Sequence, residues 1–289
     1  MTVGILMALA TTVVWSLSTI ADKVALSRAD VIVYGFVRPL VASLLVAVYG
    51  LATSTLVFPR VSLILLGAAS GLIDMLLGAA LFMFAIKRTS AHEAGALANT
   101  APLWGVLAAV LWLGEPATPP VFIAALLVIS GAFLLAGRRP AKRGGSSRLG
   151  NLAAAAAGLA FAIADTAISK YCLTQGMSPA TLLFLCVACP AAGWGLVAAF
   201  TGRFRRRYYN RRDLGFAFST AAVGMFGGQM LWYLALQRAP ASVLSPIRGA
   251  LTLFVFLFSI LLLRERPSRR SAIGVALVGA GVLLVSWLR

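Results

Sequence analysis

The sequence predicts an all-α integral membrane protein of ten transmembrane helices arranged as two inverted five-helix repeats. Three observations lead to this prediction. The 289 residues are 61% hydrophobic and only 11% charged, whereas soluble domains carry about a quarter charged residues. Apolar runs of close to 20 residues, about the length that crosses a bilayer core, recur along the chain. The chain also contains one apolar unit twice, at an offset of 150 residues.

The repeat is visible in blocks that align without a gap. Leu111–Leu135 aligns on Leu261–Val285, and Ala85–Leu97 aligns in the same register on Ala235–Ile247. The matching positions of the first pair of blocks include Leu113, Glu115, Gly131 and Leu134, which meet Leu263, Glu265, Gly281 and Leu284. Two copies of one apolar unit in a membrane chain predict a transporter with its site at the repeat interface.

Ten apolar runs separated by short connections define the elements in order. We predict helices over 3–22, 31–51, 61–85, 92–113, 120–137, 150–171, 179–201, 213–236, 241–263 and 271–288. The first run lacks a basic leader, so we expect a spanning helix rather than a cleaved signal peptide. Five helices is an odd number, so the second copy enters the membrane upside down. We therefore divide one membrane domain into a first repeat (1–138), a basic linker (139–149) and a second repeat (150–289).

The net charge of +17 would suggest nucleic-acid binding in a soluble protein. Here the basic residues lie between apolar runs, as in Arg138–Arg148 and Arg203–Asp213, which predicts contact with anionic lipid headgroups and no nucleic-acid partner. The connections after odd-numbered helices, with Arg38, hold 20 of the 25 Lys and Arg residues. By the positive-inside rule this face is cytoplasmic and both termini lie outside. The Ala/Arg-rich usage suggests a bacterial inner membrane.

The sequence gives little support to an enzyme or a metalloprotein. Cys172, Cys186 and Cys189 make no disulfide framework, and with a single histidine (His92) we expect buried apolar cysteines and no metal or other cofactor. A membrane hydrolase would need a nucleophile with a base, paired aspartates or a metal cluster. No phosphate-loop motif indicates ATP coupling.

The paired repeats resemble the EamA family of the drug/metabolite transporter superfamily over nearly the whole chain. The resemblance is carried by Ala85–Leu97 and Ala235–Ile247, and by the Glu115 and Glu265 elements with their trailing Gly131 and Gly281. It implies a ten-helix carrier that moves small metabolites, including amino acids, vitamins and other organic ions, often outward. Family members are commonly drawn with both termini in the cytoplasm, whereas the arginines of this chain predict the reverse.

Ionisable groups inside a bilayer need a partner or a water-filled cavity. The ionisable residues expected within the spans are Asp22, Lys23, Arg38, Asp74, His92, Glu93, Asp165, Lys170 and Arg248. Arg38 and Arg248 lie about seven residues into their helices, on the order of 10 Å deep. We hypothesise two ion pairs, Asp22–Arg38 on one face and Asp165–Arg248 on the other, acting as alternate gates or as clamps for a charged substrate group. The alternative is that both arginines snorkel to lipid phosphate.

Backbone context favours a cavity at Arg248. Pro246 and Gly249 disturb the helix there, and freed backbone groups at membrane depth are tolerated where they line a cavity. Asp74, near the middle of the third span, could exchange protons and couple transport to a pH gradient, or could be neutral and hydrogen-bonded to a neighbouring helix. Further candidates for the cavity lining are the interior amides Asn99 and Gln229 and the interior aromatics Trp15, Trp104, Trp232 and Tyr233, although packing is the commoner role of such aromatics.

Several other residues fit structural roles. Glu93 matches the dipole of the fourth helix, and Glu115 and Glu265 are expected to be structural residues in helix-ending turns. Gly67–Gly71 and Gly224–Gly228 are small-x-x-x-small pairs that predict close helix approach at the repeat interface.

The function that these observations favour is secondary transport of a small polar metabolite, in the export direction, by alternating access around a central cavity. Because basic and acidic groups are both buried, an amino acid or similar zwitterion is the preferred substrate. The alternatives are a flippase for a lipid-linked sugar or phosphate and a carrier of organic anions or phosphorylated metabolites. The sequence predicts no oligomeric state.

Overall fold

The computed structural model describes residues 1–26, 28–88, 94, 97–116, 118–135, 147–205, 208–263 and 269–287, and these ranges contain helices and no strand. The first repeat contains α1 (Thr2–Leu26), α2 (Val31–Ala52), α3 (Val61–Gly71), η1 (Leu72–Gly78), α4 (Ala79–Arg88), α6 (Ala101–Leu111) and α7 (Pro119–Leu135). The second contains α8 (Arg148–Ala162), η2 (Ile163–Ile168), α9 (Ser169–Thr174), α10 (Pro179–Phe200), α11 (Arg211–Thr220), η4 (Ala221–Gly228), α12 (Gln229–Arg238), α13 (Ala241–Arg248), α14 (Leu251–Leu263) and α15 (Arg269–Ser286).

The helices are apolar around most of their surface, as bilayer-spanning helices are. In the described residues, seven helical stretches are long and apolar enough to cross a membrane. Three shorter apolar helices accompany them, over Ala101–Leu111, Pro119–Leu135 and Ala272–Ser286. Polar side chains begin several helices: the Asp30 carboxylate accepts from the first amides of α2, and the Ser178 hydroxyl accepts from the Thr181 amide of α10. The predicted residues His92, Glu93 and Glu265, and most of the linker 139–149, lie outside the described ranges.

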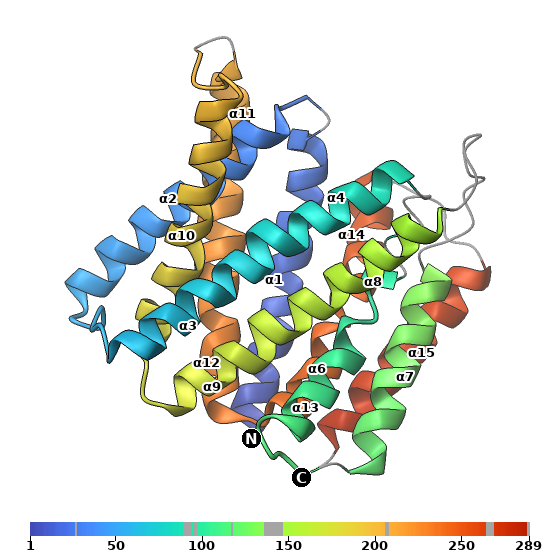
Figure 1. The fold of residues 1–289 in the computed structure, drawn as a ribbon. Helices are drawn as coiled ribbons and strands as arrows, with labels where there is room; N and C mark the ends of the chain where they lie inside the picture. Colours follow the sequence, from blue (N-terminus) through green and yellow to red (C-terminus); the bar gives the residue numbers. More distant parts are fainter. Residues whose placement is uncertain are drawn as a thin grey trace.

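The crossing of α7 and α15 shows how the repeats are related (Figure 1). A Cβ added to Gly131 would lie 2.6 Å from the Gly274 carbonyl oxygen, and a Cβ added to Gly281 would lie 2.7 Å from the Ala124 carbonyl oxygen. The two contacts are equivalent under the repeat, because Gly281 is the counterpart of Gly131 and Ala124 is the counterpart of Gly274 at the offset of 150 residues. The two helices therefore cross in a symmetric way, as expected for two copies related by a twofold axis.

The predicted close approaches at the small-residue pairs are confirmed. A Cβ on Gly71 of the first repeat would lie 2.5 Å from the Cys186 Cα of the second, and a Cβ on Gly224 would lie 2.2 Å from the Ser18 Oγ of α1. Only glycine fits where the backbone of one helix meets its neighbour at this separation. These contacts bring the middle of the third and eighth predicted spans against the opposite repeat.

Irregular backbone marks the middle of the molecule. The π-helical turns η1, η2 and η4 interrupt three long helices, and η1 and η4 occupy matching positions in the two repeats. The span predicted as one helix over 241–263 is instead two helices, because α13 ends at Arg248 and α14 begins at Leu251. The disturbance expected beside Pro246 and Gly249 is thus confirmed. π-Helical turns and broken helices are common at functional sites.

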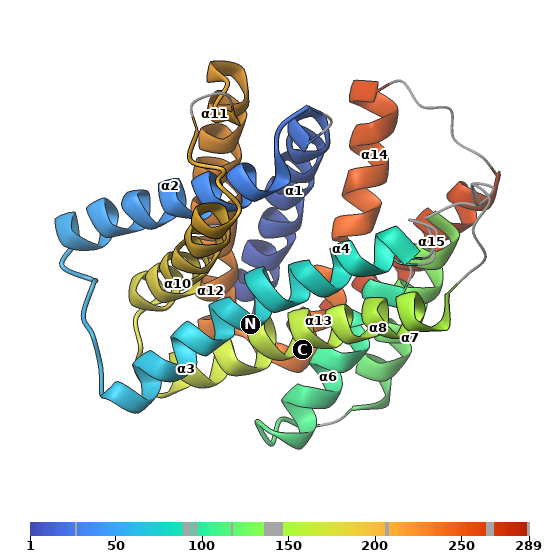
Figure 2. The same cartoon turned by 45° about the horizontal axis from the view of Figure 1, so that its top comes forward.

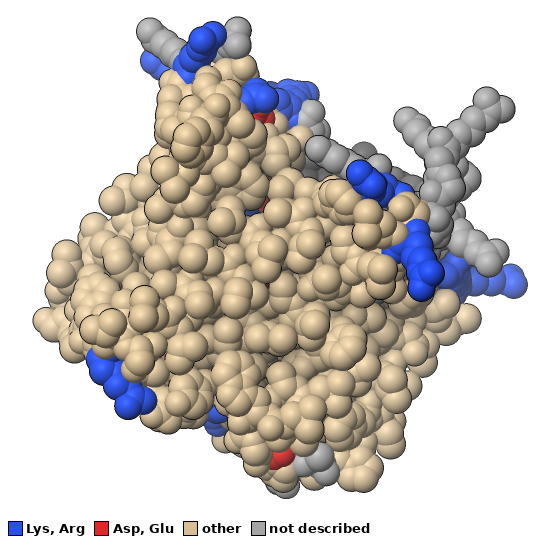
Figure 3. Space-filling view, viewed as in Figure 1, with Lys and Arg blue, Asp and Glu red and all other residues tan. Residues whose placement is uncertain are grey.

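Both chain termini lie at one end of the molecule in Figure 1, which we call the terminal end. The last turn of α1 and the first turn of α11 lie at the opposite end (Figures 1 and 2). Figure 3 shows most of the visible Lys and Arg side chains around this opposite end, which we call the basic end.

Candidate functional site

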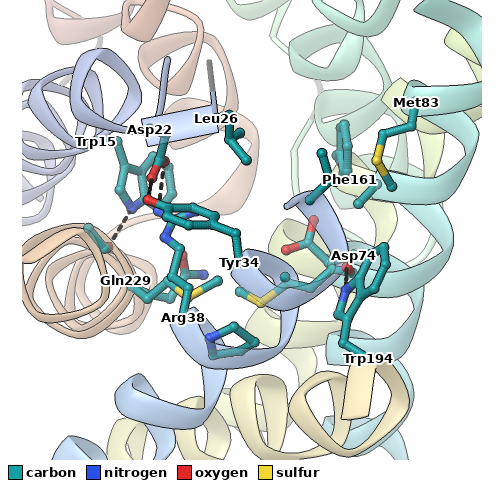
Figure 4. Close-up of a pocket in the computed structure, with 17 residues that line it drawn as sticks. Trp15, Asp22, Leu26, Tyr34, Arg38, Asp74, Met83, Phe161, Trp194 and Gln229 are labelled. Atoms are coloured by element: carbon teal, nitrogen blue, oxygen red, sulfur yellow. Dashed lines mark hydrogen bonds and ion pairs between the residues drawn. The ribbon is translucent and has the colours of Figure 1, made fainter. Parts of the chain in front are cut away.

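Two adjoining cavities lie between the repeats. The larger, of about 540 Å³, is called the charged cavity because Asp22, Arg38, Asp74, Asp165 and Arg248 all line it. The smaller, of about 360 Å³, is called the Tyr34 cavity and is drawn in Figure 4. The residues that line both are Trp15, Asp22, Arg38, Asp74, Phe161 and Gln229.

The Asp165–Arg248 ion pair expected from the sequence is present. The Arg248 Nη2 lies 3.0 Å from the Asp165 Oδ2, and the Asp165 side chain is only 3% exposed. Gln229 donates from its side-chain amide to the other oxygen of Asp165, and Arg248 Nη1 donates to the Phe161 carbonyl at 3.3 Å. Hydrogen bonds from an arginine and an amide fix the orientation of a buried carboxylate. The Asp165 carboxylate therefore holds the Arg248 guanidinium in place at the wall of the charged cavity.

Two tryptophans flank the Arg248 guanidinium. Its Cζ lies 5.4 Å from the Trp15 ring centroid and 5.8 Å from that of Trp232. The rings are themselves held by hydrogen bonds, from Trp15 Nε1 to the Gly224 carbonyl at 3.1 Å and from Trp232 Nε1 to the Asp165 carbonyl at 3.0 Å. Aromatic faces attract cations, so the arginine is held in place without a lipid phosphate.

The Asp22–Arg38 ion pair is also present and belongs to a polar network. Arg38 Nη2 lies 3.1 Å from Asp22 Oδ2, and the same nitrogen donates to Ser18 Oγ at 3.1 Å. The Tyr34 hydroxyl donates to Asp22 Oδ1 at 2.6 Å and lies 2.8 Å from Thr220 Oγ1. Figure 4 shows Tyr34, Asp22 and Arg38 together on one side of the pocket, with Asp74 and Trp194 on the other.

The two ion pairs, which were expected on opposite faces, line one charged cavity. The reason is the packing of α1 with α12, η4 and α14 of the other repeat. This packing brings the Asp22 end of α1 and the broken helix at Arg248 to a shared space.

Asp74 differs from the other two acids of the cavity. It lies on the π-helical turn η1 and lines both cavities. Among the described residues its carboxylate has neither a hydrogen bond nor an ion pair, whereas Asp22 and Asp165 each have both. The sequence alternative of a neutral group hydrogen-bonded to a neighbouring helix therefore finds no donor in the described part of the chain. Asp74 is the carboxylate available to a ligand or a proton.

The remaining predicted residues divide between the cavity and the core. Asn99 lines the charged cavity, and Trp232 is fully buried behind Arg248. Tyr233 is 1% exposed within the main hydrophobic core, so the prediction that it lines the cavity is wrong. Trp104 is absent from the lining of both cavities and donates to Thr100 Oγ1 at 3.1 Å on its own helix. Depth along a helix, which suggested these aromatics, does not determine the direction in which a side chain points.

The sequence analysis missed several residues of the site. Tyr34 lies four residues before Arg38 on α2, a spacing that places both on one helix face and could have identified it. Ser18 stands four residues before Asp22 on α1 in the same way. Thr220 and Phe161 carry no comparable signal, because Thr220 reaches Tyr34 only through the packing of α11 against α2 of the other repeat, and Phe161 takes part through its backbone carbonyl, which accepts from Arg248.

The cavities open toward the basic end. The Tyr34 cavity is lined by Leu26 and Val31, at the end of α1 and the start of α2, and both side chains are exposed. Figure 3 shows a hollow in the surface below the basic end. Toward the terminal end, buried side chains of α1, α12 and α13, among them Ala8, Leu236 and Leu244, belong to one continuous core. In the described part of the chain, the charged groups are therefore open toward the basic end and covered toward the terminal end.

Comparison with known proteins places this architecture. The sequence matches the model of the EamA-like transporter family twice, over residues 2–137 and 148–287. A search of curated proteins found no significant match to the sequence. A crystal structure described only as that of a protein has the same fold, with a TM-score of 0.80 and 20% identity over 98% of this chain and 96% of the other. Since the family matches cover both repeats and nearly the whole chain, the protein belongs to the EamA-like transporter family.

Proposed function

We propose that this member of a membrane transporter family is a secondary exporter of a small zwitterion, such as an amino acid, that works by alternating access. The observation that carries the substrate class is the lining of the charged cavity, which Arg38 and Arg248 share with Asp74, a carboxylate without a partner among the described residues. A carboxylate of the substrate would bind at the arginines, and its ammonium group would bind at Asp74. Desolvated opposite charges at fixed positions favour a ligand that carries both signs.

The proposed topology has ten membrane crossings, which count the shorter apolar helices as spans. The two halves are 1–138 and 150–289, joined by the basic linker 139–149. The basic end faces the cytoplasm of a bacterial inner membrane and contacts anionic headgroups, and both termini lie outside. A cavity open at that end would load substrate from the cytoplasm, which supports export.

The experiment is a binding and transport assay on purified protein. Thermal unfolding in detergent would be followed with amino acids, organic cations, organic anions, phosphorylated sugars and short polyprenyl phosphates. A ligand at 100 times its dissociation constant stabilises by about 2.7 kcal/mol, which moves the melting temperature measurably. We expect a zwitterion to give the shift and to exchange across proteoliposomes.

Variants connect the response to the site. Arg248→Gln and Asp74→Asn should each abolish the zwitterion shift in folded protein. The matched control is Arg203→Gln, which breaks an Arg–Asp ion pair of 2.7 Å with Asp30 outside both cavities. Asp74→Asn should also remove any dependence of exchange on a pH gradient. A zwitterion shift that survives Arg248→Gln would refute the assignment of the site.

Other results would select the alternative functions. A shift with polyprenyl phosphates alone would indicate a flippase, with the arginines as phosphate ligands. A shift with organic anions or phosphorylated sugars alone would indicate an anion carrier, and Asp74→Asn would then strengthen binding rather than abolish it.

A further inference from the structure

The terminal end of the molecule is closed by the connection between α12 and α13, and two charged side chains hold this connection. Glu115 reaches it from the end of α6 in the first repeat, and Lys170 reaches it from α9 in the second. Neither residue lines the cavities described above. Their role therefore differs from that of the site residues.

Glu115 caps a helix that belongs to the other repeat. Its Oε1 accepts from the Ala241 amide at 2.8 Å, and its Oε2 accepts from the Ser242 amide at 2.8 Å and from the Ser242 hydroxyl at 2.7 Å. Gly114 has a φ of 66°, in the left-handed region, which lets the chain reverse after α6 and turn Glu115 toward α13. A carboxylate at a helix start satisfies free amides and meets the positive end of the helix dipole.

Lys170 holds the end of the preceding helix in the complementary way. Its ammonium donates to the Leu236 carbonyl and, at 2.9 Å, to the Ala239 carbonyl. A cation at the last carbonyls of a helix satisfies free acceptors and meets the negative end of the dipole. The pair therefore fixes α12 at its end and α13 at its start, with opposite charges matched to opposite helix ends.

Helix α13 connects this clamp to the site. It is 8 residues long, or about 12 Å at 1.5 Å per residue. Its first residues are bound by Glu115, and its last residue is Arg248 in the charged cavity. The helix ends there, before α14 begins at Leu251. A rigid segment with a break at one end can tilt as a unit, so movement at the clamp would reach Arg248.

We propose that Glu115 and Lys170 form the gate on the terminal end, and that their release from the α12–α13 connection opens the cavity to that side. This inference rests on the proposed alternating access. Charged groups bound to backbone at helix ends suit such a gate, because each bond is strong while it is closed and each charge can be solvated when it opens. Glu115, which the sequence predicts to be structural, would then also take part in the conformational change.

The test is the reactivity of a reporter cysteine behind the gate. Ser245 lies on α13 and is 1% exposed, so Ser245→Cys would be introduced after replacing Cys172, Cys186 and Cys189 by alanine. A membrane-impermeant maleimide would be applied to sealed vesicles from the side that carries the termini, and separately from the other side. The accessibility of an N-terminal tag to protease identifies the sides.

We expect slow labelling from the terminal side in the reporter protein. Glu115→Gln and Lys170→Met should each raise this rate about tenfold or more, as the loss of a charge-assisted bond to a two-state element predicts. Arg238→Gln is the matched control: Arg238 is the last residue of α12, next to the connection, and donates to the Leu234 carbonyl of its own helix. Its labelling should equal that of the reporter protein.

Labelling of folded Glu115→Gln and Lys170→Met at the reporter rate would overturn the proposal. So would an equal increase from both sides, because a purely structural role would loosen the protein without a preferred direction. If Glu115→Gln does not fold, Lys170→Met decides the question by itself. The assay contains no substrate, so a wrong substrate class would leave its result unchanged and the two failures can be told apart.

Discussion

The two ion pairs of the cavity differ in burial, and this difference predicts a difference in free energy. The Asp165 side chain is 3% exposed and its partner Arg248 is 20% exposed, whereas Asp22 and Arg38 are 17% and 22% exposed. Breaking a fully buried pair by removing one partner costs about 3–5 kcal/mol. Exposed pairs contribute about 0–1 kcal/mol.

The surroundings of Arg248 reduce the cost expected for breaking the Asp165–Arg248 pair. In Asp165→Asn the Arg248 guanidinium keeps the Phe161 carbonyl and the two tryptophan faces. We therefore expect Asp165→Asn to lower the free energy of unfolding by about 2–3 kcal/mol, below the range for a fully buried pair. Asp22→Asn should lower it by about 1 kcal/mol, because water reaches both partners.

The assay is equilibrium unfolding in mixed micelles of a mild detergent and sodium dodecyl sulfate, with a double-mutant cycle. Asp165→Asn, Arg248→Gln and the double variant should give a coupling of about 2 kcal/mol, since groups in direct contact are not additive. Equal costs for Asp165→Asn and Asp22→Asn, or a coupling at Asp165–Arg248 below about 0.5 kcal/mol, would refute the view that burial sets the strength of these pairs.

Three further predictions follow from the packing and the topology. Gly71→Val should lower the free energy of unfolding by about 2 kcal/mol or more, because a Cβ there would meet the Cys186 backbone at 2.5 Å. The control is Gly215→Ala, where an added Cβ would have nothing within 4 Å. Equal melting temperatures for the two variants would contradict the close approach. Tyr34→Phe removes the hydroxyl that Asp22 accepts from and should lower stability by about 1 kcal/mol; an unchanged melting temperature would show that Arg38 and Ser18 hold the network without it. Tags at either terminus should be cleaved by protease added to intact spheroplasts, while a tag within 139–149 should be cleaved only after permeabilisation; the opposite pattern would reverse the proposed orientation.

The sequence contained enough information for the class of protein and for the pairing of its charges. Apolar runs and their repetition predicted a helical membrane protein. The length of an apolar run can be taken from the local sequence alone, and that length determines whether a helix can cross the bilayer core. The pairs Asp22–Arg38 and Asp165–Arg248 were predicted from depth alone, since few partners exist at each depth. The break beside Pro246 was likewise visible, because proline removes a backbone donor wherever it stands.

The tertiary structure decided which of these groups share a space. Depth does not specify the face of a helix that meets its neighbour, so Trp15 and Trp232 flank Arg248 while Trp104 and Tyr233 do not. The shared chamber of the two ion pairs and the reach of Glu115 into the other repeat depend on how helices cross. Helix crossings are set by many small contacts between distant segments, and no single stretch of this sequence contains them.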